Sequence, residues 1–337
     1  PAAPRHAFDG PFRATSKTDG AAAQATGIAW TALPVLYGYS DFGAVAATPA
    51  QRRFTNTLEQ FLVLVGRVED ALRTVPDTAW GVAPHSLRAV SPATLTGLLE
   101  ALGDQSSCPV HLHIAEQRAE VRACEAWSGQ RPVAWLLDHA PVDERWCAVH
   151  ATHMTGEESR ALAASGACVA LCPTTEANLG DGIFEGGPYV AAGGVWAIGS
   201  DSHVSVDAAG ELRLLEYSQR LARRERNVLA RDADTLGSSG RYLFERAARA
   251  GGQACGRRTG VIATGYRGDL ICLDHDDPAF VGASGDGWLD RWIFAANRPV
   301  VAHVWVGGKQ VLEHGQHRAQ GRIAERFRQA LRTLMDA

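Results

Sequence analysis

Long apolar runs and dense positive charge are scarce in this 337-residue sequence. We find no run of eighteen apolar residues and no signal-peptide pattern, so we expect a cytoplasmic protein without a membrane partner. The formal net charge is −4, and the one basic stretch, 220–226, has the pattern of a solvated helix face. We therefore expect no nucleic-acid partner.

Paired cysteines are also missing. The seven cysteines are an odd number and include no Cys-x-x-Cys motif. Most lie inside apolar strand-like runs, where a free cysteine behaves as a small hydrophobic residue. This usage is typical of a reducing compartment and does not predict a disulfide framework.

What is present is an alternation of strand-like and helix-like segments. The length and an apolar fraction of 46% predict a globular chain with one large domain and a smaller one. Strand-like runs followed by helical or loop segments are typical of a parallel α/β structure. They occupy 28–36, 78–84, 108–116, 146–150, 167–171 and 195–199.

The predicted secondary structure changes beyond residue 256. Short strands are predicted at 261–263, 269–274, 300–306 and 307–312, with a hairpin signal at 306–311, and a charged amphipathic helix at 323–335. We therefore divide the chain into a partial barrel, 1–255, and a small β-sandwich segment with a C-terminal helix, 256–337.

Three of the predicted strands end in residues that bind metals or move protons. His113, His150 and Asp201 come at strand ends, and Glu116 follows His113 by three residues. In a parallel barrel these ends converge on one face, where catalytic groups collect. Imidazole and carboxylate groups at one point can hold a metal ion beside a proton shuttle. His111 shares a face with His113 but precedes the strand end, which favours a hydrogen-bonding role.

Several longer motifs carry a family resemblance. They cover 83–90, 111–117, 127–133, 171–182 and 199–203. Together with the three strand ends they resemble the metal-dependent amidohydrolase superfamily, and within it the bacterial deiminases of histidine degradation. The resemblance implies a (β/α)8 TIM-type barrel with a small C-terminal β domain.

The resemblance also implies roles for individual residues. His113 and Asp201 would be ligands of one zinc ion per chain, or of another divalent metal. Glu116 would be the proton shuttle, His150 would orient the hydrolytic water and Asp201 would accept its proton. His85 and Arg88 would bind the substrate. The implied reaction converts N-formimino-L-glutamate and water into N-formyl-L-glutamate and ammonia, and the implied assembly is a homodimer.

The sequence departs from this family at its start. The family's first barrel strand carries a His-x-His zinc pair, which we do not find; a lone imidazole at His6 is the nearest feature. We therefore expect an N-terminally truncated chain without the first barrel strands. Two alternatives stay open: an inactive barrel that serves as a binding or structural protein, and a deaminase of a purine-type ring. A ring deaminase needs an aromatic stacking surface, whereas the stretch at 84–88 offers a cation.

Overall fold

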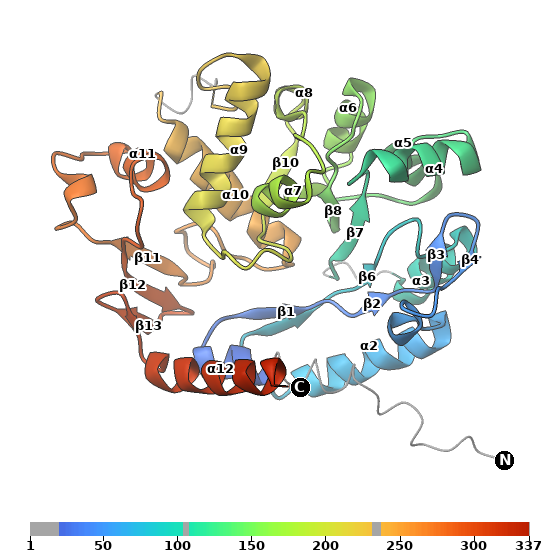
Figure 1. Ribbon diagram of the computed structural model, residues 1–337, viewed down its shortest axis with the longest axis horizontal. Helices are drawn as coiled ribbons and strands as arrows, with labels where there is room; N and C mark the ends of the chain where they lie inside the picture. Colours follow the sequence, from blue (N-terminus) through green and yellow to red (C-terminus); the bar gives the residue numbers. More distant parts are fainter. Residues whose placement is uncertain (1–19, 104–107, 231–236, 337) are drawn as a thin grey trace.

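The computed structural model describes residues 20–103, 108–230 and 237–336 (Figure 1). His6 lies outside these ranges. No helix in the described part is both long and apolar enough to cross a membrane.

A curved parallel sheet forms the centre of the molecule. Its first two strands are each divided into two short segments, β1 followed by β2 and β5 followed by β6. Strand β1 pairs in parallel with β5, and β2 pairs in parallel with β6. Strand β6 then joins the next strand, β7, through parallel bridges. The remaining order is β7-β8-β9-β10, all parallel. The bounds are β1 Trp30–Ala32, β2 Val35–Leu36, β5 Thr78–Trp80, β6 Ala83–Pro84, β7 Val110–Ile114, β8 Trp146–His150, β9 Cys168–Leu171 and β10 Val195–Ile198. A short antiparallel pair, β3 Tyr39–Asp41 and β4 Val45–Ala46, follows β2.

Helices follow the strands along the chain (Figure 1). They are α2 Leu58–Leu72, α3 Pro92–Leu102, α4 Arg118–Ser128, α5 Pro132–His139, α6 Gly156–Ala164, α7 Pro173–Leu179, α8 Gly186–Ala191, α9 Ala208–Arg223 and α10 Ser239–Ala254. The predicted α/β alternation is therefore confirmed. Helix α2 begins at Leu58, because Thr57 and Gln60 form a capping box there.

Burial along β7 shows how the sheet divides its two faces. Val110, Leu112 and Ile114 are buried in the main core. Their alternation places His111 and His113 on the opposite face. The lower part of that face is covered by α10, whose Ala250 and Ala254 pack in a small cluster with Cys147, Cys168 and Ala197.

The end of α10 also reaches across to β1. The side chain of Thr31 donates to the carbonyl of Cys255 (2.9 Å), and the Arg257 guanidinium donates to the carbonyls of Trp30 and Asp77. Among the described residues, β10 pairs only with β9 and β1 only with β5. The α10 segment therefore connects the two outer strands of the sheet.

The C-terminal part contains one antiparallel sheet in the order β11-β12-β13-β14. The bounds are β11 Leu270–Leu273, β12 Val301–Val306, β13 Lys309–Glu313 and β14 Gln316–His317, with α11 Gly287–Phe294 and α12 Gln320–Met335. The hairpin at 306–309 is confirmed, whereas the strand predicted at 261–263 is wrong: this segment is an irregular turn before β11. The described residues here form one sheet and not two packed sheets.

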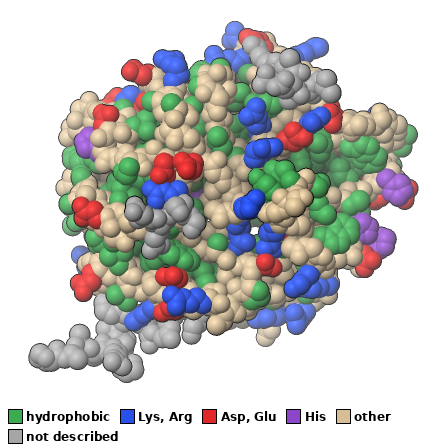
Figure 2. All heavy atoms as spheres, turned by 180° about the vertical axis from the view of Figure 1, so that it is seen from behind, with side chains coloured by type: hydrophobic (Ala, Val, Ile, Leu, Met, Phe, Trp, Pro, Cys, Tyr) green, Lys and Arg blue, Asp and Glu red, His purple; other side chains and the backbone are tan. Residues whose placement is uncertain are grey.

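Helix α11 packs against α9 and α10 of the barrel. Because this helix of the C-terminal part contacts helices of the barrel, the domain boundary between residues 255 and 256 stays a prediction. On the side opposite to Figure 1, acidic and basic side chains are interspersed (Figure 2).

Candidate active site

The candidate site lies at the carboxyl ends of the parallel strands. His85 follows β6, Glu116 follows β7 and Asp201 follows β10, while His113 and His150 lie at the ends of β7 and β8. The backbone takes the left-handed conformation at Ala115 (φ 50°), His150 (69°), Ala151 (48°) and Asp201 (48°). These values are uncommon for residues with a side chain, and such conformations concentrate at functional sites.

Three of the imidazoles form a row. The ring centroids of His85 and His113 are 4.9 Å apart, and those of His113 and His150 are 5.6 Å apart. Tyr37 extends the row with an edge-on contact to His85 at 4.7 Å. Successive members of the row are 28 to 48 positions apart in the chain, so the fold brings distant residues into contact.

His113 is held as a neutral ring with a defined tautomer. Its Nδ1 donates to the carbonyl oxygen of His85 (2.8 Å), so the lone pair is left on Nε2. Burial, assisted by the nearby His150, lowers the pKa of His113 even though Glu116 and Asp201 oppose the shift. A neutral imidazole with a free Nε2 is the form that binds a metal ion.

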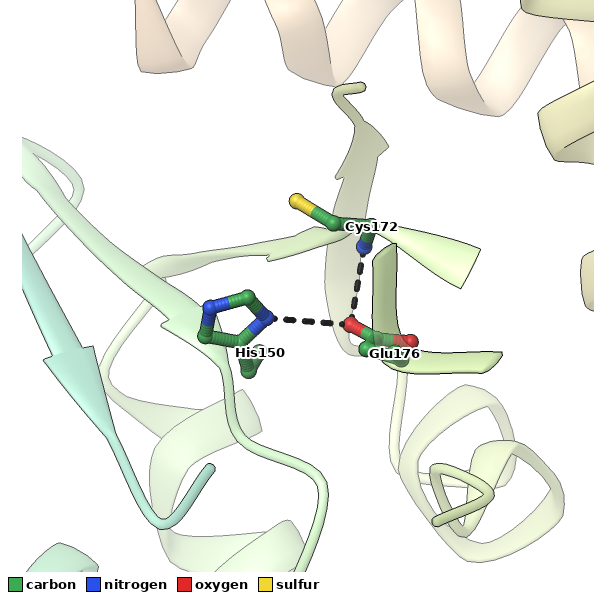
Figure 3. A group of neighbouring side chains, drawn as sticks. All are labelled: His150, Cys172 and Glu176. Atoms are coloured by element: carbon green, nitrogen blue, oxygen red, sulfur yellow. Dashed lines mark hydrogen bonds and ion pairs between the residues drawn. The ribbon is translucent and has the colours of Figure 1, made fainter. Parts of the chain in front are cut away.

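His150 is fully buried between carboxylates. Its Nδ1 contacts Oε1 of Glu176 at 3.2 Å (Figure 3). Its Nε2 lies 3.9 Å from Glu116 Oε1 and 3.9 Å from Asp201 Oδ2, and has no hydrogen-bond partner in the described part of the chain. Although burial lowers it, the pKa of His150 is raised overall by the carboxylates of Glu176, Glu116 and Asp201.

Arg88 lies on the other side of Glu116. Its Nη2 is 3.7 Å from Glu116 Oε2 and 3.9 Å from Glu120 Oε2. The buried Nε–H of Arg88 has no partner among the described residues. An unpartnered guanidinium N–H is costly unless a ligand satisfies it. A guanidinium in this environment can pair with a carboxylate.

His85 is the least basic of the imidazoles. Burial, together with His113 and Arg88, lowers the pKa of His85 to about 4. Its Nδ1 is 3.1 Å from Ser86 Oγ. A neutral ring here can donate or accept a single hydrogen bond from a substrate without adding charge.

All six residues that the sequence singled out thus meet in one cluster; their individual roles stay predictions. Other histidines lie outside it. His111 bonds the carbonyl of Ala254 (2.7 Å), as expected for a hydrogen-bonding residue, and His153 bonds the carbonyl of Asp181 (2.8 Å). His203 accepts a hydrogen bond from the backbone N–H of Ser205 (3.0 Å).

Two buried glutamates were missed by the sequence reasoning. The carboxylate of Glu120 accepts the backbone N–H groups of Ala115 (3.0 Å) and Glu116 (3.1 Å), which fixes the turn after β7. Glu176 accepts the N–H of Cys172 (2.8 Å) and faces His150. The available signal was an acidic residue in the first turn of a helix just after a strand. That signal does not identify which side chain the carboxylate contacts.

The donor set at this centre fits a zinc ion. The lone pair on Nε2 of His113 is available, Nε2 of His150 is unpartnered, and the carboxylates of Glu116 and Asp201 are close by. Nitrogen and oxygen ligands of this kind are those of catalytic zinc sites.

A parallel barrel with imidazoles and carboxylates at its carboxyl end defines a hydrolase that activates water. A sequence profile of the amidohydrolase family matches residues 51–311. The chain is 47% identical over 315 residues to formimidoylglutamate deiminase of Pseudomonas aeruginosa, covering 94% of this chain and 68% of that enzyme. It is 29% identical over 237 residues to a 5-methylthioadenosine/S-adenosylhomocysteine deaminase of Pyrococcus abyssi, covering 68% of this chain and 52% of that protein.

Comparison with solved structures supports the same family. An amidohydrolase from Brucella melitensis superposes with a TM-score of 0.88 at 46% identity, covering 94% of this chain and 68% of that one. An adenosine deaminase from Xanthomonas campestris with bound zinc gives 0.75 at 26% identity, covering 94% and 70%. The chain belongs to the amidohydrolase family and has its TIM-barrel fold. It is a hydrolase of carbon–nitrogen bonds, and it spans about two thirds of the deiminase and half of the Pyrococcus enzyme.

Proposed function

We propose that this protein hydrolyses N-formimino-L-glutamate to N-formyl-L-glutamate and ammonia, as a zinc-dependent cytoplasmic step of histidine degradation. The observation that supports it best is the unpartnered Nε–H of Arg88 beside the imidazole–carboxylate cluster. The likeness to the Pseudomonas deiminase points to the same substrate.

The substrate carries two carboxylates, one on the carbon that bears the formimidoyl nitrogen and one at the end of the side chain. Arg88 offers a planar guanidinium that matches a carboxylate in charge and geometry. His85, kept neutral by its low pKa, adds a hydrogen bond without competing charge. The formimidoyl carbon would then lie toward Glu116 and His150, because both are adjacent to Arg88 in the cluster.

The remaining residues handle the protons. His150, through Nε2, orients the water that attacks the formimidoyl carbon, and Asp201 accepts a proton from that water. Glu116 carries the other proton of the water to the departing nitrogen and Asp201 returns its proton there, so the carbon–nitrogen bond breaks, ammonia leaves and the formimidoyl C=NH becomes a formyl C=O. A zinc ion, which His113 and Asp201 would hold, lowers the pKa of water toward about 7.

The purified chain, supplied with zinc, tests the proposal through ammonia release from N-formimino-L-glutamate, with adenosine and guanine as comparison substrates. We expect one ammonia per formimino group, loss of the activity in Asp201→Asn, and full activity in Asp276→Asn, whose side chain lies in an exposed loop. Release no faster than that of Asp201→Asn would favour an inactive binding protein. Faster release from adenosine or guanine would replace the substrate with a purine-type ring.

A further inference from the structure

Glu176 lies behind His150, on the side away from the reacting groups. It belongs to the first turn of α7, and its residue is only 4% exposed. Oε1 accepts the backbone N–H of Cys172 at 2.8 Å and faces Nδ1 of His150 at 3.2 Å (Figure 3). The carboxylate is therefore anchored to the loop after β9 and directed at an imidazole that ends β8.

Because of the backbone conformation at His150, a residue from another element must hold the direction of its ring. With φ at 69° at His150, the last residue of β8, and 48° at Ala151, the backbone leaves the extended conformation, so the alternation of β8 no longer directs the ring. A carboxylate oxygen can only accept a hydrogen bond, so Nδ1 must carry a proton, and in the neutral ring Nε2 then holds the lone pair. Nε2 is buried, lacks a partner in the described residues, and is directed between Glu116 and Asp201.

His150, Cys172 and Glu176 together have the composition of a metal site. One donor atom from each lies within 4.8 Å of the others. Two observations speak against that use. Oε1 of Glu176 is already occupied by the Cys172 N–H and by His150. Burial and the carboxylates of Glu176 and Asp201 raise the pKa of the Cys172 thiol, which keeps it protonated.

We propose that Glu176 is a positioning residue of the reaction: it holds the ring of His150 and fixes the tautomer that presents Nε2 to the attacking water. This inference rests on the proposed function for its kinetic consequence only. Partners that orient histidines at metal sites are typically worth about 10- to 100-fold in metal affinity or activity.

The test compares Glu176→Ala and Glu176→Gln with the control Glu211→Ala. Glu211 is equally buried and likewise accepts a backbone N–H in this region, that of Thr174 (2.9 Å). Glu176→Ala should lower kcat about 10- to 100-fold with little change in KM. Glu176→Gln keeps an amide oxygen in the same place, so it should recover most of kcat. Glu211→Ala should keep kcat among the molecules that remain folded.

The second readout is the nitrogen NMR spectrum of histidine-labelled protein. The wild type should show an Nδ1–H signal that is absent in His150→Gln, retained in Glu176→Gln and lost in Glu176→Ala. Unchanged kcat in Glu176→Ala, an equal loss in Glu211→Ala, or a His150 ring protonated at Nε2 but not at Nδ1 would overturn the inference. If the wild type releases no ammonia, the proposed function fails, and the NMR comparison still decides the role of Glu176.

Discussion

At the scale of single residues, the cluster separates binding from chemistry. Arg88 contacts Glu116 on one side and leaves its Nε–H unpartnered, whereas His150 lies on the other side of the same carboxylate. Glu116 is thus placed between the group proposed to bind the substrate and the group proposed to orient water. Substitutions on the two sides should therefore affect different kinetic constants.

Arg88→Lys keeps the positive charge but loses the planar fork. We expect kcat/KM for N-formimino-L-glutamate to fall by about 10- to 1,000-fold, mostly through KM, with zinc content unchanged. Arg122→Lys, on the exposed face of α4, is the matched control and should leave both constants unchanged. An unaltered KM in Arg88→Lys would contradict the assigned substrate contact.

Glu116→Gln removes the proposed proton carrier while preserving its shape. The expected result is a fall in kcat of about 100- to 10,000-fold with a smaller change in KM, because proton transfer and not binding is lost. Glu125→Gln, exposed on the following helix, serves as control. Steady-state kinetics at saturating substrate decide the matter, and a wild-type kcat would assign the proton transfer to another group.

At the scale of elements, buried glutamates stabilise the turns that follow the strands. Glu120 and Glu176 each come from the first turn of the helix after a strand, and each accepts backbone N–H groups at the strand exit. The strand thus places the site residue, and the glutamate of the next helix fixes the turn through its hydrogen bonds. This arrangement explains how left-handed backbone at Ala115 is kept in place beside Glu116.

Helix starts away from the site should influence stability alone. The capping box of α2 joins Thr57 and Gln60 through reciprocal hydrogen bonds of 3.2 and 3.0 Å. Thr57→Ala should lower the free energy of unfolding by about 1 kcal/mol, and Thr57→Ser should restore it. Chemical denaturation measures both. Equal stability of the alanine and serine variants would show that the cap contributes nothing.

At the scale of the whole molecule, ion pairs connect the C-terminal part to the barrel. Arg267, which precedes β11, contacts Asp77 beside β5 (2.5 Å) and Asp269 (2.9 Å). The hydrogen bond from Arg267 lowers the pKa of Asp77. Although burial opposes it, hydrogen bonds from the Gly307 N–H, Thr259 and Arg267 lower the pKa of Asp269.

The sign of the pH effect follows from these lowered pKa values. Their stabilisation is present above the unfolded-state value of about 3.9 and is lost as the pH falls through the folded-state values. We therefore expect Arg267→Met to melt below the wild type at pH 7, with the gap closing below about pH 4. Arg328→Met, which breaks an exposed pair on α12, should show no such trend. A gap in Tm that is constant with pH would contradict the assignment.

Assembly is a second prediction at this scale. The homodimer implied by the family resemblance should give twice the chain mass of 36.0 kDa in light scattering after size exclusion. A single-chain mass at micromolar concentration would contradict it.

The sequence alone determined which residues could react and in what order along the chain. Strand ends carrying His113, His150 and Asp201 are local patterns, because apolar alternation and the following helix starts depend on near neighbours. Tertiary structure decided the rest. The contact of His150 with Glu176, 26 residues later, and that of Arg88 with Glu116 arise only when separate strands are brought side by side. The left-handed backbone at His150 also changes where the ring points, and strand periodicity has no means of encoding that direction.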